Sequence, residues 1–154
     1  MRVLFLDFDG VMATDYHSIV MERDGLPDRD DFGVIFDPQC VENLSRIIAS
    51  TGADIVVTSD WQEIMTYQDI CRMWEFRHLP GSVIDSVSVI SKRRGDNIDA
   101  WIESYGPLES YLIIDDLPIC EFNNGQLDHL IQVDSYRGLH DSVIDKAISI
   151  LLCR

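Results

Sequence analysis

Residues 3–11, Val-Leu-Phe-Leu-Asp-Phe-Asp-Gly-Val, predict a strand with a polar site at its end. The apolar run predicts a buried strand over residues 2–8. Side chains two residues apart in a strand share one face, so Asp7 and Asp9 would point the same way. Gly10 gives the backbone the freedom to turn sharply behind them. Open α/β sheets bind ligands at the carboxyl ends of their strands, where these two carboxylates would lie.

The close spacing of Asp7 and Asp9 favours a bound cation. Two neighbouring carboxylates repel each other unless a proton or a cation lies between them. Mg²⁺ takes oxygen ligands and is usually held by one or two carboxylates, with water and phosphate oxygens in the other positions. The alternative is that Asp7 and Asp9 only end the strand and cap a turn, since Asp-x-Asp-Gly strings also occur in ordinary turns and in calcium loops.

The composition is typical of one globular domain, residues 1–154. Hydrophobic residues make up 46% of the chain, which is enough to form a core and argues against disorder. The apolar runs are too short to span a bilayer, and Asp7 and Asp9 interrupt the first one, which is unlike a signal peptide. We therefore expect a cytoplasmic protein without a membrane partner. The four cysteines are far apart in the sequence, which argues against a zinc or redox site.

The strong negative charge limits the partners that the chain can bind. The net charge is −15, from 27 acidic and 12 basic residues. Such a chain is not expected to bind nucleic acid nonspecifically through phosphate contacts. A single nucleotide or one strand end could still bind in a locally basic pocket.

Strands and helices are expected to alternate, which favours a parallel sheet. Residues 9–36 form a long polar connection that we expect to be irregular and to act as a flap or lid. Asp37 and Pro38 predict a helix start, and Gly52 predicts its end. Further strands are expected at 53–57, 111–114 and 130–133, with a short strand within 82–90, and further helices are expected at 62–76, at 95–105 and after Gly138.

Polar residues follow several of these predicted strands. Thr58 and Ser59 come after the second strand, and Asp115 and Asp116 come after the strand at 111–114. The carboxyl ends of parallel strands share one edge of a sheet, so these side chains should converge with Asp7 and Asp9 on one site. Asp134 also follows a strand, but we expect it to cap that strand end. The tryptophans at 61, 74 and 101 are expected to pack in the core, and the acidic run 28–31 to be a solvated loop.

These motifs resemble those of the haloacid dehalogenase (HAD) superfamily in order and rough spacing. The matching elements are Asp-Phe-Asp-Gly-Val, the strand ending in Thr58, the basic cluster 92–94 and Asp115-Asp116. Within the superfamily the chain is similar to the HAD domain of Swiss army knife RNA repair proteins, in the segments 51–61, 94–102, 113–116 and 137–139. The resemblance implies a Rossmann-like three-layer α/β sandwich with a central parallel sheet and a minimal cap or none.

The resemblance also implies a role for each acidic residue. Asp7 would be the nucleophile that forms an aspartyl-phosphate, and Asp9 would be the general acid and base. Asp7, the backbone carbonyl of Asp9 and Asp115 would bind Mg²⁺, and Asp116 would be a direct or water-mediated ligand. Gly10 would lie beside the bound substrate.

Two assignments stay open between neighbouring residues. Thr58 or Ser59 would bind a phosphate oxygen, and Thr58 is preferred because it follows the strand directly. A cation of the cluster Lys92, Arg93 and Arg94 would offset the phosphoryl charge. Lysine is usual in the superfamily, which favours Lys92, whereas the position before Gly95 favours Arg94 as the subfamily pattern.

The function implied is that of a Mg²⁺-dependent phosphatase. Its substrate would be a phosphorylated small molecule, a nucleotide or a polynucleotide end. A phosphotransferase would use the same residues. The alternative from a different class is a non-catalytic binding or regulatory module that holds a phosphorylated ligand or a protein partner on the same fold, although Asp7 and Asp9 are both intact.

Overall fold

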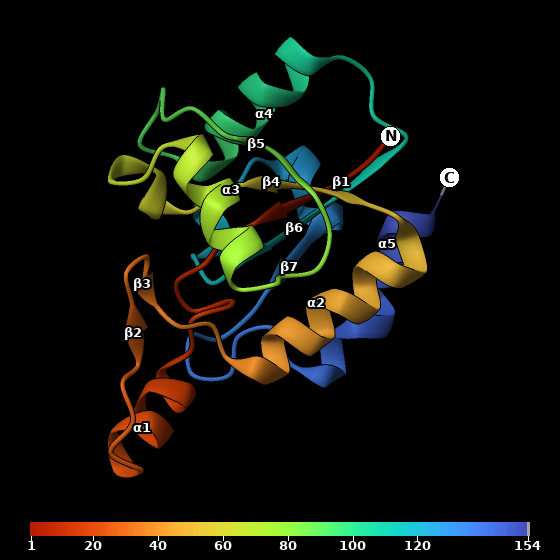
Figure 1. The fold of residues 1–154 in the computed structure, drawn as a ribbon. Helices are drawn as coiled ribbons and strands as arrows, with labels where there is room; N and C mark the ends of the chain where they lie inside the picture. The colour runs from red at the N-terminus through yellow and green to blue at the C-terminus, as the bar shows by residue number, and fades with distance from the viewer. Residues whose placement is uncertain (154) are drawn as a thin grey trace.

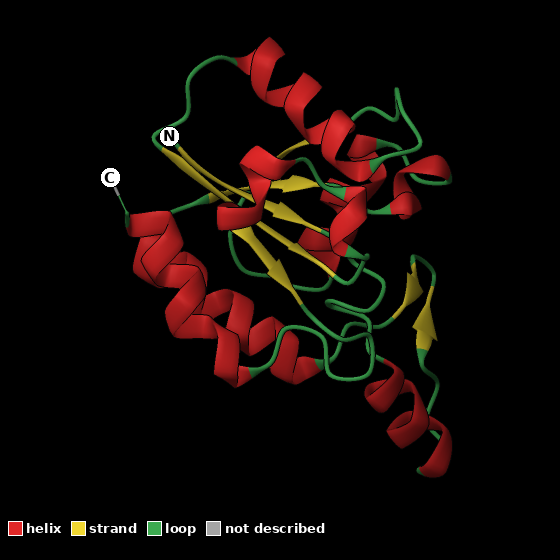
Figure 2. Ribbon diagram, turned by 180° about the vertical axis from the view of Figure 1, so that it is seen from behind, coloured by secondary structure: helices red, strands yellow, loops and turns green. Residues whose placement is uncertain are grey.

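Strand β1 (Arg2–Leu6) lies at the centre of the sheet although it comes first in the chain. The structure is a computed structural model that describes residues 1–153. Within these residues the main sheet has five parallel strands in the order β5-β4-β1-β6-β7, flanked by helices on both faces (Figures 1 and 2). The other strands are β4 (Asp54–Val57), β5 (Val83–Ser86), β6 (Ser110–Asp115) and β7 (Leu130–Gln132). This three-layer α/β arrangement confirms the expected fold class.

Both faces of β1 are buried, which is why its sequence is continuously apolar. Leu4 and Leu6 pack in the core beneath α2 (Pro38–Thr51) and α5 (Ile144–Leu152). Val3 and Phe5 pack in a second core beneath α4 (Arg94–Tyr105). All four side chains are fully buried. The strands on either side of β1 are β4 and β6, so the connections leave in opposite directions there and open a crevice at the carboxyl ends.

Helix α2 begins and ends where the sequence predicts. The side chain of Asp37 accepts a hydrogen bond from the backbone N–H of Gln39 at 2.9 Å, and Pro38 occupies the first turn. Gly52 has φ of +63°, the left-handed conformation that commonly ends a helix.

The prediction that residues 9–36 are irregular was wrong. This segment holds helix α1 (Asp15–Arg23) and the hairpin of β2 (Arg29–Asp30) and β3 (Gly33–Val34). Every residue of α1 is at least partly exposed, and the helix extends away from the sheet in both ribbon views (Figures 1 and 2). A helix that packs little against a core needs no apolar stripe, so the periodicity that predicts helices is missing.

The hairpin is held by an ion pair that the sequence does not suggest. Arg77 donates hydrogen bonds of 2.8 and 2.7 Å to the carboxylate of Asp30. Its guanidinium group lies 5.0 Å from the centre of the Phe36 ring. The acidic run 28–31 is therefore not simply a solvated loop.

Two helix boundaries differ from the predicted ones, and two short helices between β6 and β7 were not predicted. The helix expected at 62–76 is divided into the 3-10 helix η1 (Asp60–Glu63) and α3 (Tyr67–Phe76), because Thr66 and Asp69 form a capping box that starts α3. The last helix starts after the 3-10 helix η4 (Asp141–Val143). The 3-10 helices η2 (Ile119–Glu121) and η3 (Asn124–His129) connect β6 to β7. As expected, the three tryptophans are buried. Among the described residues, no helix has the length and apolar character needed to cross a membrane.

Candidate active site

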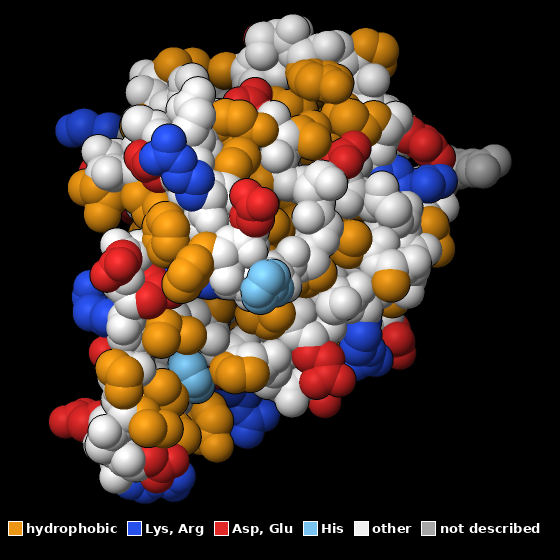
Figure 3. Space-filling view, viewed as in Figure 1, with side chains coloured by type: hydrophobic (Ala, Val, Ile, Leu, Met, Phe, Trp, Pro, Cys, Tyr) orange, Lys and Arg blue, Asp and Glu red, His pale blue; other side chains and the backbone are white. Residues whose placement is uncertain are grey.

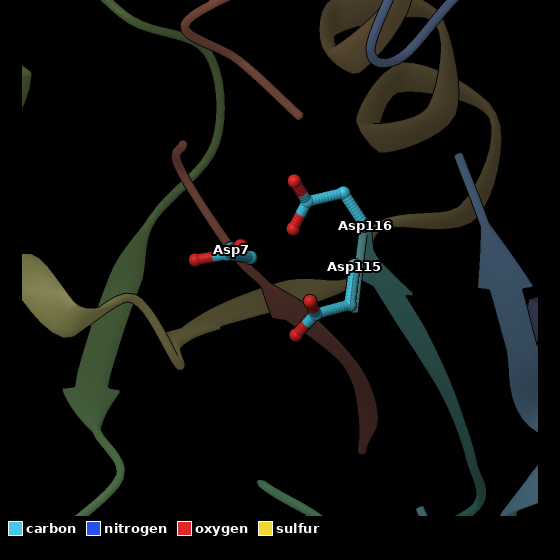
Figure 4. A group of neighbouring side chains, drawn as sticks. All are labelled: Asp7, Asp115 and Asp116. Carbon is cyan, nitrogen blue, oxygen red and sulfur yellow. The ribbon is translucent and has the colours of Figure 1, made fainter. Parts of the chain in front are cut away.

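Three carboxylates meet at the carboxyl ends of β1 and β6. Asp7 follows β1 directly, Asp115 is the last residue of β6, and Asp116 follows it. One oxygen atom from each side chain lies within 4.8 Å of the others, and Figure 4 shows the three side chains around one small space. Asp7 and Asp115 are buried, with 4% and 0% of their surface exposed. The expected convergence of residues 7, 115 and 116 is therefore present.

Burial makes three negative charges at this point unfavourable. Burial, followed by the charge of Asp115, raises the pKa of Asp7 to about 8. Burial also raises the pKa of Asp115 to about 6 and raises the pKa of Asp116. Without a further cation, the cluster would therefore hold a proton at neutral pH.

The carboxylate cluster fits a magnesium ion. Its ligand atoms are all carboxylate oxygens, which is the donor type that Mg²⁺ prefers. The Oδ2 atom of Asp115 is buried and has no hydrogen-bond donor among residues 1–153. Its one cationic neighbour among these residues is Arg94, whose Nε atom lies 3.5 Å away without donating a hydrogen bond, so the oxygen can still accept a metal ion or water. Asp9 contributes no carboxylate oxygen to the cluster of the described residues.

Arg94 is the cation that lies against these carboxylates. Its Nε atom is 3.5 Å from Asp115 Oδ2, and its Nη2 atom is 4.0 Å from Asp7 Oδ1. Nη2 also donates a 3.3 Å hydrogen bond to Asp60. Arg94 begins α4, where the helix dipole disfavours a cation. The carboxylates around it therefore account for its buried position.

The other two cations of the cluster 92–94 lie elsewhere. Lys92 is exposed and forms no ion pair with any described residue, although it lines a cavity beside Arg94. Arg93 pairs with Asp96 and donates to the carbonyl oxygens of Cys120 and Phe122. This geometry favours Arg94 over Lys92 as the cation of the site.

The two candidate hydroxyl groups have different surroundings. Thr58 is buried, and its Oγ1 atom has no hydrogen-bond partner within residues 1–153. The Oγ atom of Ser59 instead accepts a hydrogen bond from the backbone N–H of Trp61 and caps η1. Thr58 therefore has the free hydroxyl group, whereas that of Ser59 has a structural partner.

Asp9 is exposed beside the cluster and is oriented by a tryptophan. The indole Nε1–H of Trp61 donates a 2.9 Å hydrogen bond to Asp9 Oδ1. Sequence reasoning identified Trp61 as a core residue and missed this second contact. It also missed the pairing of Asp60 with Arg94. The only sequence signal for either contact is that both residues directly follow the Thr58-Ser59 pair.

Gly10 is required by both conformation and space. Its φ of +74° is unfavourable for any residue with a Cβ atom. A Cβ atom at this position would lie 2.1 Å from Asp116 Oδ2. A larger residue here would displace a carboxylate of the cluster.

Comparison with known families agrees with the geometry. The family model described as the HAD domain in Swiss Army Knife RNA repair proteins matches residues 3–144. Comparison with curated proteins and with solved structures gave no match. The matched region holds β1, the carboxylate cluster, Thr58 and Arg94, and it covers most of the chain. The chain therefore belongs to the family of HAD domains found in Swiss Army Knife RNA repair proteins.

Proposed function

We propose that this protein is a Mg²⁺-dependent phosphatase that hydrolyses phosphate monoesters through an aspartyl-phosphate on Asp7. The observation that carries the proposal is the joint placement of three carboxylates, a buried cation and an unpartnered hydroxyl group at one sheet edge. Phosphoryl transfer depends mainly on positioning and on compensation of charge, and this set of groups supplies both.

In the first step, the Asp7 carboxylate attacks phosphorus and the bond to the leaving oxygen breaks. Asp9 donates a proton to that oxygen, and the alcohol leaves. In the second step, Asp9 takes a proton from water, which attacks the phosphorus of the aspartyl-phosphate. The P–O bond to Asp7 breaks, inorganic phosphate leaves, and Asp7 is restored.

The remaining residues neutralise and orient the phosphoryl group. Mg²⁺ held by Asp7, Asp115 and Asp116 would keep the nucleophile ionised and offset charge on the phosphoryl oxygens. Arg94 adds a fixed positive charge within 4.0 Å of Asp7. The Thr58 hydroxyl can donate to a phosphoryl oxygen, which would give this buried group the partner it lacks among the described residues.

The exposure of Asp9 suits its proposed role. A general acid and base must reach both the leaving oxygen and the attacking water. Asp9 lies at the surface of the site, while Asp7 is buried beneath it. The hydrogen bond from Trp61 helps to orient the Asp9 side chain.

The test is phosphate release by the purified protein, with Mg²⁺ and with a chelator. The substrates are p-nitrophenyl phosphate, nucleoside monophosphates and 5′- and 3′-phosphorylated oligonucleotides, and Asp7→Asn is assayed beside the wild type. We expect release that needs both Mg²⁺ and Asp7. Release that persists in a folded Asp7→Asn variant would contradict the covalent mechanism. If Mg²⁺ binds but no substrate is turned over, a binding module or a transferase that needs another acceptor becomes the better interpretation.

A further inference from the structure

A cavity of about 570 Å³ opens beside the proposed phosphoryl site. Thr58 and Arg94 are among the residues that line it, so the leaving group of a phosphoryl group bound between them can extend into this space. The size is within the range of pockets that bind small molecules, roughly 300 to 1,000 Å³. The residues that line the cavity should therefore select the leaving group.

One wall of the cavity is apolar and held in place. Val87, Val89 and Ile90 line it, and the last two are 54% and 69% exposed. The buried side chain of Asn97 accepts hydrogen bonds from the backbone N–H groups of Ile90 and Ser91 at 3.0 and 2.8 Å. It also donates a 3.0 Å hydrogen bond to the carbonyl oxygen of Ser91. The wall thus presents apolar side chains that an apolar part of a ligand would cover.

The charged residues of the cavity are mainly acidic. Asp60, Glu63 and Glu121 line it together with Lys92 and Arg94. The Arg94 guanidinium group is already placed against carboxylates of the catalytic cluster and Asp60. A leaving group that carries a negative charge of its own, besides the phosphoryl group that is transferred, would therefore meet two carboxylates, Glu63 and Glu121. Among the described residues that line the cavity, the only positive charge left to offset it would be the exposed Lys92.

From the apolar wall and the acidic lining, we propose that the cavity takes an uncharged, partly apolar leaving group such as a nucleoside, and discriminates against leaving groups that carry further phosphates. This inference rests on the proposed phosphatase function and narrows its substrate class. Nucleoside monophosphates fit it, because their single phosphate is the group transferred. The 5′ end of a polynucleotide does not, because its leaving group carries phosphodiester charges into the cavity.

The first experiment compares kcat/KM for adenosine 5′-monophosphate and for the 5′-phosphorylated dinucleotide of adenosine. The leaving groups share the nucleoside and differ by one phosphodiester and the nucleoside beyond it. We expect a preference for the monophosphate of about tenfold at low salt, decreasing as salt screens the carboxylates. The double variant Glu63→Gln, Glu121→Gln should reduce the preference to about threefold or less by improving turnover of the dinucleotide. Glu103→Gln, which removes an exposed charge from α4 outside the cavity, is the matched control and should leave the ratio unchanged.

The second experiment tests the apolar wall. Ile90→Ser should raise KM for adenosine 5′-monophosphate by about fivefold, since the variant loses aliphatic surface that the bound ligand would cover. Inhibition by inorganic phosphate should be unchanged, because phosphate alone does not reach the wall. An equal loss of phosphate inhibition would mean that the variant damages the phosphoryl site itself.

The outcomes separate this inference from the proposed function. Mg²⁺- and Asp7-dependent turnover of p-nitrophenyl phosphate with a preference for the dinucleotide would overturn the inference and leave the phosphatase intact. A preference for the monophosphate that the glutamate variants do not change would also overturn it, because the acidic lining would not be its cause. Absence of phosphate release from every substrate, p-nitrophenyl phosphate included, would overturn both proposals.

Discussion

At the scale of single residues, Asp7 combines reactivity with a cost in stability. A buried carboxylate next to two others is unfavourable, and its pKa is raised to about 8 by burial and by the charge of Asp115. In the presence of chelator at pH 9, Asp7→Asn removes this charge while keeping the shape of the side chain. We expect the variant to unfold at a temperature higher by about 2–4 °C, which corresponds to about 1 kcal/mol in a domain of this size. Thermal unfolding followed by circular dichroism measures it, and a lower unfolding temperature than wild type would contradict the electrostatic argument.

The hydrogen bond from Trp61 to Asp9 makes a second residue-scale prediction. Trp61→Phe removes the N–H donor and keeps an aromatic ring against Phe8, whose ring centre is 5.4 Å from that of Trp61. We expect kcat for an alkyl phosphate to fall by about tenfold, because an Asp9 side chain that has lost this hydrogen bond protonates the leaving oxygen less efficiently. The loss should be smaller for p-nitrophenyl phosphate, whose leaving group needs no proton.

Trp74→Phe is the matched control for that experiment. Trp74 packs in the same aromatic group, with its ring 6.1 Å from Phe8, but its N–H donates to the carbonyl oxygen of Pro80. The control should affect both substrates equally. Equal losses in Trp61→Phe would contradict a role of this residue in protonation of the leaving oxygen by Asp9.

The sequence predicts this site well in its acidic residues and poorly in its partners. Asp7 and Asp115 are identified because each directly follows or ends an apolar strand, so their place at the sheet edge follows from topology. Three successive cations at 92–94 cannot be ranked in the same way. Their choice depends on where α4 starts, and only its first residue, Arg94, faces the carboxylates.

At the scale of secondary-structure elements, the β2–β3 hairpin depends on one ion pair. Only 7% of the Arg77 side chain and 21% of the Asp30 side chain are exposed. Removing one partner of such a pair leaves a poorly solvated charge, so we expect Asp30→Asn to lower the free energy of unfolding by about 2 kcal/mol. Urea unfolding measures the change. Asp31→Asn, at the exposed neighbouring position, is the control and should change it by less than about 0.5 kcal/mol.

Elements that pack on the sheet were predictable, and those that leave it were not. Helix α2 has a cap at Asp37 and buries Leu44 and Ile47, so both its limits and its inward face can be read from the pattern. Helix α1 has a capping threonine, Thr14, but no buried residue along its described length. Its hydrogen bonds and its cap hold the helix locally. Because it buries no side chain, its sequence lacks the periodic apolar residues from which a helix could be predicted.

At the scale of the whole molecule, the charge of the site couples stability to pH and to Mg²⁺. Burial raises the folded-state pKa of Asp7 to about 8 and that of Asp115 to about 6, above the ordinary value of 3.8. Folding thus favours the protonated carboxyls. Their contribution to stability is fully present below about pH 4 and is lost as pH rises through 6 and then 8. With chelator present, we therefore expect the unfolding temperature to decline from pH 5 to pH 9.

Magnesium should reverse that decline, because it binds the deprotonated carboxylates of the folded state. The increase in unfolding temperature on adding Mg²⁺ should accordingly be larger at pH 8 than at pH 5, where protons compete for the same oxygens. Differential scanning calorimetry at both pH values, with and without Mg²⁺, measures the four unfolding temperatures. Asp115→Asn is the control, since it removes one ligand and should reduce the Mg²⁺ effect at pH 8. An Mg²⁺ effect of equal size at both pH values would mean that the ion binds elsewhere on this acidic chain, whose net charge of −15 offers many weaker sites.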